Sequence, residues 1–510
     1  MATFLIGLVI LILGGAIYGG ICEKVFSPDD RKTPAFTRQD GVDFVPMPEW
    51  KNSLINLLNI AGTGPILGPI QGILFGPIAF ISIPLGCVLA GAVHDYFTGM
   101  ISIREGGIQM PEIVRRNTNS AIHKLYTVFV CIVLFLVGVV FIYTPGDIIA
   151  TQLCGFGGTP GEISTWIIYG AIFAYFLVAA LFPIDKIIGK IYPIFGAILL
   201  LSALGVFGML IIKGYPLANV WEPWVLNGFD FGSYFKSENF IPTFFVTVAC
   251  GIMSGFHSTQ ITIITRTMES EREGRHTIFN MMIAEGFIAM VWAAATMAMI
   301  GVGAENSGIT VQLTEKGWTY FANVAGQLQQ ISATSVVGVV CRNMLGPIGG
   351  VIAIIGVIIL PISTGDTALR SLRITIADAL KADQSNNRKR LLLAAPIFVV
   401  TCLVLVWAKI NPQGFNTIWR YFGWSNQTLA VFALASIALW FIRNNRKKYL
   451  WIPMVPLLFY SFVISSYITH ADIGISLPRT VSLVIGGIFT VAMAAIMINA
   501  AKRSETDVQA

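Results

Sequence analysis

Charged residues are scarce in this chain: Asp, Glu, Lys and Arg together make up 12% of its 510 residues. Soluble proteins carry about 25%. Hydrophobic residues make up 55% and the mean hydropathy is +0.73. Apolar runs of about 20 residues, long enough to cross a bilayer, recur along the chain. The shortage of charge excludes a series of soluble domains and predicts one all-α polytopic membrane domain.

Cysteine motifs are also missing. The seven cysteines form no CxxC pair, and most stand inside apolar runs. Their odd number and irregular spacing exclude a readable disulfide framework or structural zinc site. We interpret them as small buried apolar side chains, and we expect no cofactor. The cysteines are Cys22, Cys87, Cys131, Cys154, Cys250, Cys341 and Cys402.

The N-terminal apolar run lacks a basic leader and an A-x-A cleavage site. We therefore expect a retained first helix rather than a signal peptide. With the runs that follow, the sequence predicts about 13 transmembrane helices. The predicted spans are 2–21, 53–74, 78–103, 121–143, 163–182, 190–212, 240–265, 276–301, 347–372, 391–408, 416–441, 449–470 and 477–501.

Lys and Arg are divided unequally between alternate loops of this topology. The loop after the first span and every second loop thereafter hold 26 of the 33, and the other side holds 7. Basic residues are retained on the cytoplasmic face. The sequence thus predicts a multi-pass protein of a bacterial-type cytoplasmic membrane, with its N-terminus outside and its C-terminus inside. The basic loops carry no interleaved aromatics, so we expect the lipid bilayer and a small solute as partners rather than nucleic acid. The oligomeric state stays open.

Two spans are interrupted by residues that oppose helix formation. The second span crowds Gly62, Gly64, Pro65, Gly68 and Pro69 into its centre. The seventh carries ACGIMSGFHS at 249–258. Glycine and proline weaken helices, and unwound backbone survives in lipid only where it is buried in protein or lines a cavity. Interrupted spans at corresponding positions of two halves are typical of transporter binding sites.

The two interrupted spans lie five spans apart, which gives their units opposite membrane topology. A second pair of motifs has a similar relation: IYTPGD at 142–147 and PISTGD at 361–366. We therefore predict a LeuT-type 5+5 inverted repeat with a hairpin or re-entrant segment near 318–342. The predicted units are a leading helix and cytoplasmic loop (1–52), a first repeat (53–212), an external loop (213–239), a second repeat (240–441), and two trailing helices with a cytoplasmic C-terminus (442–510).

Several motifs together resemble the carbon starvation protein A (CstA) family. They are RKTPAFTRQDGVDFVP (31–46), NIAGTGPILGPIQG (59–72), LAGAVHDYFTGMISIREGG (89–107), ACGIMSGFHS (249–258), PISTGDTALRSLRITIAD (361–378) and RYFGWSNQTLAVFAL (420–434). The resemblance implies uptake of peptides, or of pyruvate as in some members, and a relation to the amino acid–polyamine–cation transporters. The chain is shorter than the larger members, and it has HDYF where glutamine precedes the aspartate in others. These departures leave the substrate open.

The two interruptions predict a substrate site built from backbone and small polar groups. A free half-helix N-terminus in the second interruption would attract an anion. His257 either binds a substrate carboxylate or moves a proton, or else it holds the kink by bonding a backbone carbonyl. The predicted substrate-binding residues are Gly62, Thr63, Gly64, Pro65, Gly251, Ser254, Gly255, Phe256, His257 and Ser258.

Ionisable side chains at membrane depth are costly, and each is a functional hypothesis. We predict proton handling or ion coupling by His94, Asp95, Glu285 and Asp366. Pairing with arginines at the inner rim is the structural alternative for Asp95. Hard oxygen ligands suit Na⁺, so a sodium site is an open alternative. Its expected ligands are Ala61, Gly64, Ser363, Thr364, Asp366 and Thr367.

Other function classes fit the sequence less well. Ser254 and His257 stand three apart on one short turn, a poor geometry for a nucleophile and its base. Asp147 and Asp366 belong to different depths, so they do not predict a carboxylate pair. A sensor is not favoured, because the sequence shows no soluble signalling segment. At the start of the eleventh span, Asn426 and Gln427 predict a buried amide pair beside an interfacial aromatic belt, or a gate of the outer vestibule. The sequence favours a symporter over an enzyme.

Overall fold

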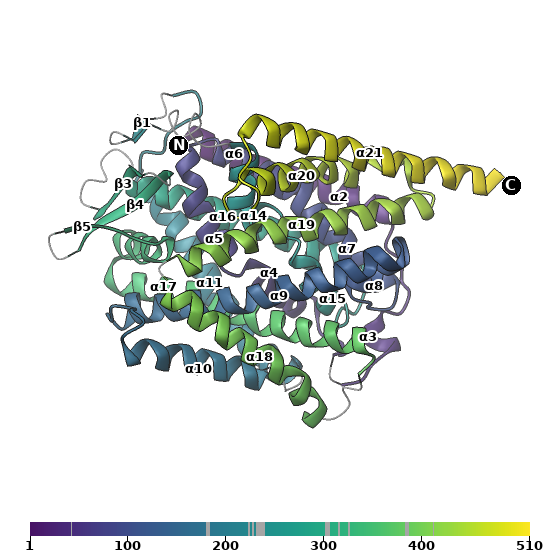
Figure 1. The fold of residues 1–510 in the computed structure, drawn as a ribbon, viewed down its shortest axis with the longest axis horizontal. Coiled ribbons are helices and arrows are strands. Elements are labelled where there is room, and N and C mark those ends of the chain that lie inside the picture. Colours follow the sequence, from purple (N-terminus) through teal and green to yellow (C-terminus); the bar gives the residue numbers. More distant parts are fainter. Residues whose placement is uncertain are drawn as a thin grey trace.

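Long helices packed side by side dominate the computed structural model (Figure 1). The N-terminus and strands β3 to β5 lie at one end of the bundle, and the C-terminus lies at the other. Termini at opposite ends fit an odd number of crossings. The structure describes residues 1–41, 43–179, 184–222, 225–226, 229–230, 240–300, 307–314, 317–324, 327–382, 387–411 and 413–509.

Ten helices of the described residues are long and apolar enough to cross a membrane, and the bent pair α4–α5 makes an eleventh. Within the described residues, each predicted span falls on helical segments. Two predicted spans are not among these eleven. The helix of the fifth span, α10, has only 17 residues, and the seventh span is divided into short helices. The multi-pass membrane architecture is therefore present, while the total of thirteen crossings stays a prediction.

The first six spans correspond to the following elements. They are α1 (Ala2–Val9), η1 (Ile10–Gly14), α2 (Gly15–Phe26), α4 (Glu49–Ala61), α5 (Gly64–Gly72), η2 (Ile73–Phe75), α6 (Ala79–Gly86), η3 (Cys87–Gly91), α7 (Ala92–Arg104), α9 (Ser120–Ile148), η4 (Ile149–Leu153), α10 (Ile163–Ala179) and α11 (Ile184–Ile212). Two short helices, α3 (Pro34–Thr37) and α8 (Met110–Asn117), lie in the connections.

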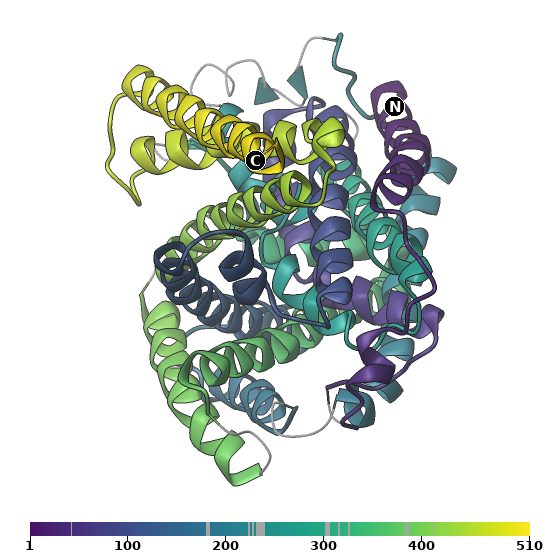
Figure 2. The same cartoon turned by 90° about the vertical axis from the view of Figure 1, so that its right-hand side faces the viewer.

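The remaining spans correspond to a second set of elements. They are η5 (Phe240–Phe244), α13 (Phe245–Thr247), α14 (Ala249–Ile252), α15 (His257–Ile264), η7 (Arg275–Phe279), α16 (Asn280–Ile300), α17 (Ala333–Leu380), α18 (Asn387–Ile410), α19 (Gly414–Arg443), α20 (Trp451–His470) and α21 (Arg479–Gln509). The 3₁₀ turns η6 (Glu271–Glu273) and η8 (Lys447–Tyr449) precede η7 and α20. In Figure 2 the trailing helix α21 lies at the margin of the bundle.

The all-α prediction is wrong for the segment before α17. Strands β3 (Ile309–Thr314), β4 (Gly317–Val324) and β5 (Gln327–Gln330) form an antiparallel sheet in that order. A two-stranded pair, β1 (Val225–Leu226) and β2 (Phe229–Asp230), is also present. The sequence of β4, GWTYFANV, is rich in aromatic residues that favour strands. The Tyr320 hydroxyl donates to the Ile70 carbonyl, which attaches the sheet to α5.

The segment predicted at 318–342 as a hairpin or re-entrant element contains the β4–β5 hairpin, and its re-entry into the membrane stays a prediction. Residues from Ala333 onward are already helical and lead into the ninth span. Gly346 kinks α17, because its φ of +72° lies in the left-handed region that glycine adopts without strain. The span predicted at 347–372 therefore begins directly after this kink.

The fourth and ninth spans, which carry the paired Gly-Asp motifs, pack against each other as α9 and α17. The fourth span is longer than predicted, since η4 continues it to Leu153 and places Asp147 inside the helix. Pro145 is accommodated within α9. The inverted relation of the two repeats, and their boundaries, stay predictions.

Candidate functional site

The first helix break separates α4 from α5, which are bent by 46°. Gly62 turns the chain with a φ of +42°, a conformation that side chains disfavour. A Cβ placed on Gly62 would come within 3.0 Å of the Phe141 ring of α9 and 3.5 Å of Thr364 Oγ1 of α17. The break is thus enclosed by the fourth and ninth spans.

The second break separates α14 from α15. Met253 is fully extended, with φ of −158° and ψ of 128°, and helix resumes at His257. Both breaks touch: a Cβ on Gly64 would lie only 1.9 Å from Cys250 Cβ. Because no side chain fits there, glycine at position 64 permits α5 and α14 to meet. The two interruptions therefore form one buried centre rather than lipid-facing turns.

Two amides of α19 bind the loose backbone of the second break. Asn426 Oδ1 accepts from the Phe256 amide at 2.7 Å and from Ser254 Oγ at 3.1 Å. Its backbone carbonyl accepts from the Gly255 amide at 3.2 Å. Gln427 Nε2 donates to the Met253 carbonyl at 2.9 Å. In this conformation the backbone amides of the second break, which we expected to face an anion, donate to protein instead. Sequence reasoning did not predict that Asn426 accepts hydrogen bonds from them.

Four ionisable side chains from three elements meet beside the breaks, and we call them the polar core cluster: His94, Asp95, His257 and Glu285. All four are 0% exposed. Asp95 Oδ1 lies 2.7 Å from His94 Nδ1, and its Oδ2 lies 2.9 Å from His257 Nδ1. His257 Nε2 lies 3.1 Å from the Ile60 carbonyl and 3.6 Å from Glu285 Oε2.

The cluster forms because each element contributes its members at one depth. His94 and Asp95 are on the first turn of α7, His257 begins α15, and Glu285 lies in the first half of α16. Sequence reasoning named each residue separately but did not predict that they touch. Asp95 pairs with histidines, and the arginine pairing offered as the alternative is not among its described ion pairs. One sequence feature could have indicated this contact: the four ionisable residues lie in apolar spans, where they can pair only with one another.

Asp366 lies outside this cluster. Its Oδ1 is 3.9 Å from Arg370 Nη2 on the same helix. Ser363 Oγ and Thr364 Oγ1 both donate to the Leu58 carbonyl, at 3.1 and 3.0 Å. Thr367 Oγ1 donates to the Thr364 carbonyl at 3.0 Å. The hydroxyls predicted to hold sodium are beside α4 as expected, but here they bind backbone.

The remaining predicted substrate residues are buried at the two breaks. Thr63 is 1% exposed, and its Oγ1 has no hydrogen-bond partner among the residues that the structure describes. Pro65 opens the first turn of α5, where its missing amide costs little. Ser258 Oγ donates to the Gly255 carbonyl at 2.6 Å. Among the described residues, no three His, Cys, Asp or Glu side chains are grouped to hold a metal.

A second ionic group, the rim network, lies where the loop after α2 meets η6. It comprises Asp29, Arg31, Arg104 and Glu271. Glu271 is buried and accepts from Arg104 Nη2 at 3.0 Å and from the Asp29 amide at 3.2 Å. The Arg31 guanidinium donates to Asp29 and holds the pKa of that carboxyl well below its ordinary value. Asp29 therefore stays ionised at any pH above its ordinary pKa, about 4.

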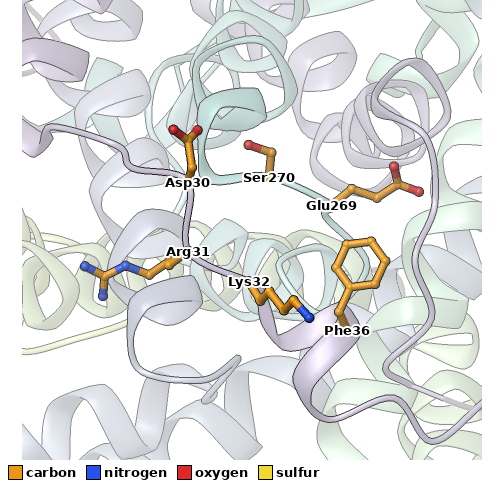
Figure 3. Close-up of a pocket in the computed structure, with 6 residues that line it drawn as sticks. All are labelled: Asp30, Arg31, Lys32, Phe36, Glu269 and Ser270. Atoms are coloured by element: carbon orange, nitrogen blue, oxygen red, sulfur yellow. The ribbon is translucent and has the colours of Figure 1, made fainter.

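A pocket of about 310 Å³ opens next to the rim network (Figure 3). Figure 3 shows two chain segments facing each other across it. It is formed by the segments 30–36 and 269–270, and no predicted site residue lines it. Its lining residues are Asp30, Arg31, Lys32, Phe36, Glu269 and Ser270.

The fold is that of LeuT-type membrane transporters. A manganese transporter of Eremococcus coleocola superposes with a TM-score of 0.55 at 11% identity, over 92% of this chain and 98% of that one. MhsT in complex with L-phenylalanine superposes with a TM-score of 0.54 at 11% identity, over 88% and 99%. At such low identity the likeness establishes the fold alone.

Within that class, the chain belongs to the carbon starvation protein CstA family, which matches residues 1–211 and 293–466. An uncharacterised membrane protein of Haemophilus influenzae is 38% identical over 58% of this chain and 91% of its own length. The peptide transporter CstA of Escherichia coli is 24% identical over 86% and 76%. The pyruvate/proton symporter BtsT of the same organism is 24% identical over the same shares. His257 and Glu285 fall between the two matched ranges.

Proposed function

We propose that the protein is a symporter that imports small peptides, or a related small carboxylate such as pyruvate, by alternating access around its two broken helices. The observation that carries this proposal is the polar core cluster, which joins both breaks while fully shielded from solvent. Isolated charges at such depth cost several kcal/mol. A transporter that must load and release an ion explains their presence.

Alternating access is supported by the packing of the breaks. The α4–α5 and α14–α15 breaks contact each other through Gly64 and Cys250, and the residues at both are buried. Unwound segments leave backbone groups that can bind a solute once the surrounding helices move apart. The substrate class comes from the relatives named as peptide transporters and as a pyruvate/proton symporter.

The proton is the coupling ion that the site supports best. Histidine changes its charge near neutral pH, and two histidines here share one carboxylate. Sodium is the second candidate, because Ser363 and Thr364 lie beside the α4 break, next to Gly62. These hydroxyls already donate to the Leu58 carbonyl, so bound sodium would require them to reorient.

The predicted cytoplasmic membrane location, with the N-terminus outside, belongs to the same proposal. Its support is the distribution of basic residues and the position of the termini at opposite ends of the bundle (Figure 1). This orientation is tested by introducing single cysteines at the two termini and labelling the protein in intact cells. Reagents that do not cross the membrane should reach only the N-terminal one.

Uptake by the purified protein in proteoliposomes tests the function. Labelled dipeptide, pyruvate and free amino acids are offered with an inward H⁺ gradient, an inward Na⁺ gradient, or neither. We expect accumulation above the outside concentration of a peptide or pyruvate when the H⁺ gradient is present, and its loss with a protonophore. Flux that no gradient drives uphill would indicate a channel, absence of flux a sensor, and product without accumulation an enzyme.

A further inference from the structure

The two nitrogens of His257 face different partners, which fixes where its protons are. The Ile60 carbonyl, 3.1 Å from Nε2, can only accept a hydrogen bond. Nε2 must therefore carry a hydrogen when this bond exists. Nδ1 lies 2.9 Å from Asp95 Oδ2, and an ionised carboxylate also only accepts. With Asp95 ionised, both nitrogens are protonated and His257 is an imidazolium.

After losing one proton, His257 can donate a hydrogen bond to only one of these two partners. A neutral imidazole has one N–H and one lone pair. The bond to an ionised carboxylate is the stronger of the two because it is charge-assisted. The remaining hydrogen therefore stays on Nδ1, and Nε2 turns its lone pair toward the lone pairs of the Ile60 carbonyl. The contact between α15 and α4 changes from attraction to repulsion.

Ile60 makes this contact consequential for the fold. It is the second-last residue of α4, so its carbonyl is one of the last four in the helix, which lack intrahelical donors. His257 is the first residue of α15. One hydrogen bond thus ties the end of one broken helix to the start of the other.

Glu285 is the acceptor in place for the departing proton. Its Oε2 lies 3.6 Å from His257 Nε2, and neither of its oxygens has a hydrogen-bond partner within the part of the chain that the structure describes. Transfer breaks the Nε2–H bond and forms an O–H bond, converting an imidazolium and a carboxylate into a neutral imidazole and a carboxylic acid. As the pH rises, the carboxylic acid releases this proton to solvent, so opening of the contact involves the net loss of one proton. The thiols nearest the cluster have other partners: Cys87 donates to the Gly251 carbonyl, and Cys250 accepts from Asn426.

We propose that the His257–Ile60 hydrogen bond is a proton-controlled latch between the two broken helices, with Glu285 receiving the proton when the latch opens. His94 acts as a positioning residue, since its bond to Asp95 Oδ1 orients the carboxylate toward His257. The proposal rests on the proposed function only in naming the proton as the coupling ion. It specifies which backbone contact the proton controls.

Hydrogen exchange of the full-length protein in nanodiscs, without substrate or gradient, tests the latch. Peptides covering residues 58–66 are followed from pH 5 to 9 by mass spectrometry, after correction for intrinsic exchange rates. We expect exchange to accelerate about tenfold through one transition, since the net contribution of a hydrogen bond to a charged group corresponds to such a factor. Uniform exchange across this range would overturn the latch.

Variants separate the latch from a general effect of pH. His257→Gln keeps an amide donor but cannot titrate, so exchange at 58–66 should lose its transition. Glu285→Gln removes the carboxylate that favours the imidazolium, so His257 should lose its proton more readily and the transition should move to lower pH; this variant tests the proposal even if His257→Gln does not fold. His276→Gln is the matched control, because His276 pairs with the Glu49 carboxylate at 2.7 Å but is exposed. A wild-type transition in His257→Gln would contradict the latch.

The outcome is independent of transport. A protein that shows the pH transition but carries no peptide or pyruvate would retain the latch and lose the proposed function. Proton-driven uptake together with pH-independent exchange would retain the function and reject the latch.

Discussion

Two groups of ion-pairing residues in this protein both contain carboxylates, but they differ in the basic partner and in exposure to solvent. The polar core cluster pairs carboxylates with histidines and is 0% exposed throughout. The rim network pairs carboxylates with arginines, and its Arg31 and Asp29 side chains are 50% and 46% exposed. Arginine stays charged at any accessible pH, whereas histidine changes charge near neutrality. The first group can therefore alternate between charge states and the second cannot.

Because of this difference, we expect substitutions in the two groups to affect different properties of the protein. The rim network joins the end of α7 to the loop after α2: Arg104 Nη2 donates to the Ser27 carbonyl at 2.7 Å, and its guanidinium lies 4.1 Å from the Phe26 ring. It fixes the rim in one geometry. The polar core cluster contacts the two broken helices on which the proposed alternating access depends. Removing a charge should alter coupling in the cluster and stability in the rim network.

Asp95→Asn should have the largest effect. The amide removes the charge to which both histidines donate, so proton-driven uptake should fall about 100-fold or more, as expected when a group that handles protons is lost. Substrate counterflow without a gradient should persist, since the breaks remain. Proteoliposome uptake with and without an H⁺ gradient measures both.

Asp472→Asn, on an exposed loop, provides the matched control and should transport normally. If Asp95→Asn accumulated substrate under a proton gradient as wild type does, the cluster would have no part in coupling.

Gly64→Ala should have the next largest effect, because its Cβ would overlap Cys250 Cβ at 1.9 Å. Overpacking of this kind costs about 1–3 kcal/mol, and it forces the two breaks apart. We expect uptake to fall about 30-fold, the factor that corresponds to about 2 kcal/mol, the middle of this range. Gly170→Ala on α10 is the control, because nothing lies within 4 Å of its Cβ.

The Gly64→Ala prediction has an internal rescue. Adding Cys250→Gly removes the atom that the new methyl group meets, so the double variant should regain uptake. If rescue failed while both proteins folded, another property of Gly64 would be responsible.

Glu271→Gln probes the rim network. It leaves Arg104 without its buried anionic partner, and breaking a buried pair in this way costs about 3–5 kcal/mol, less here because Arg104 is 14% exposed. The thermal midpoint of the protein should fall by several degrees. The pH profile of uptake should keep its wild-type midpoint, since no group of the cluster changes. A shifted midpoint would show that the two groups are coupled.

The sequence was sufficient for much of the architecture because lipid constrains it strongly. The apolar runs coincide with the long helices of the described residues, and the clustered glycines and prolines of 62–69 located the first break. The segment of β3 to β5 was assigned to an all-α fold, with only a hairpin or re-entrant element expected near 318–342, because the alternation of its strands is short and was judged against a helical background. A profile of hydropathy also cannot distinguish the sheet from a re-entrant hairpin.

The candidate site could be predicted only as separate residues. His94, Asp95, His257 and Glu285 were each identified from their charge at membrane depth, but their contacts depend on how three helices are rotated, which sequence spacing does not specify. The same limit explains Asn426: its buried amide was anticipated, but its bonds to the second break come from a helix about 170 positions away in the chain.

Arg115→Gln should have the smallest effect, because it removes an ion pair that is more exposed to solvent than the polar core cluster and the Arg104–Glu271 pair of the rim network. Arg115 Nε lies 2.5 Å from Glu112, but its side chain is 54% exposed, and surface pairs of this kind contribute little to stability. Arg116, which also binds Glu112 at 2.9 Å, remains to satisfy the carboxylate. We expect neither the thermal midpoint nor proton-driven uptake to change measurably. A clear loss of either would mean that exposure is a poor guide to the importance of an ion pair in this protein, and the contrast between the rim network and the polar core cluster would then need another basis than burial.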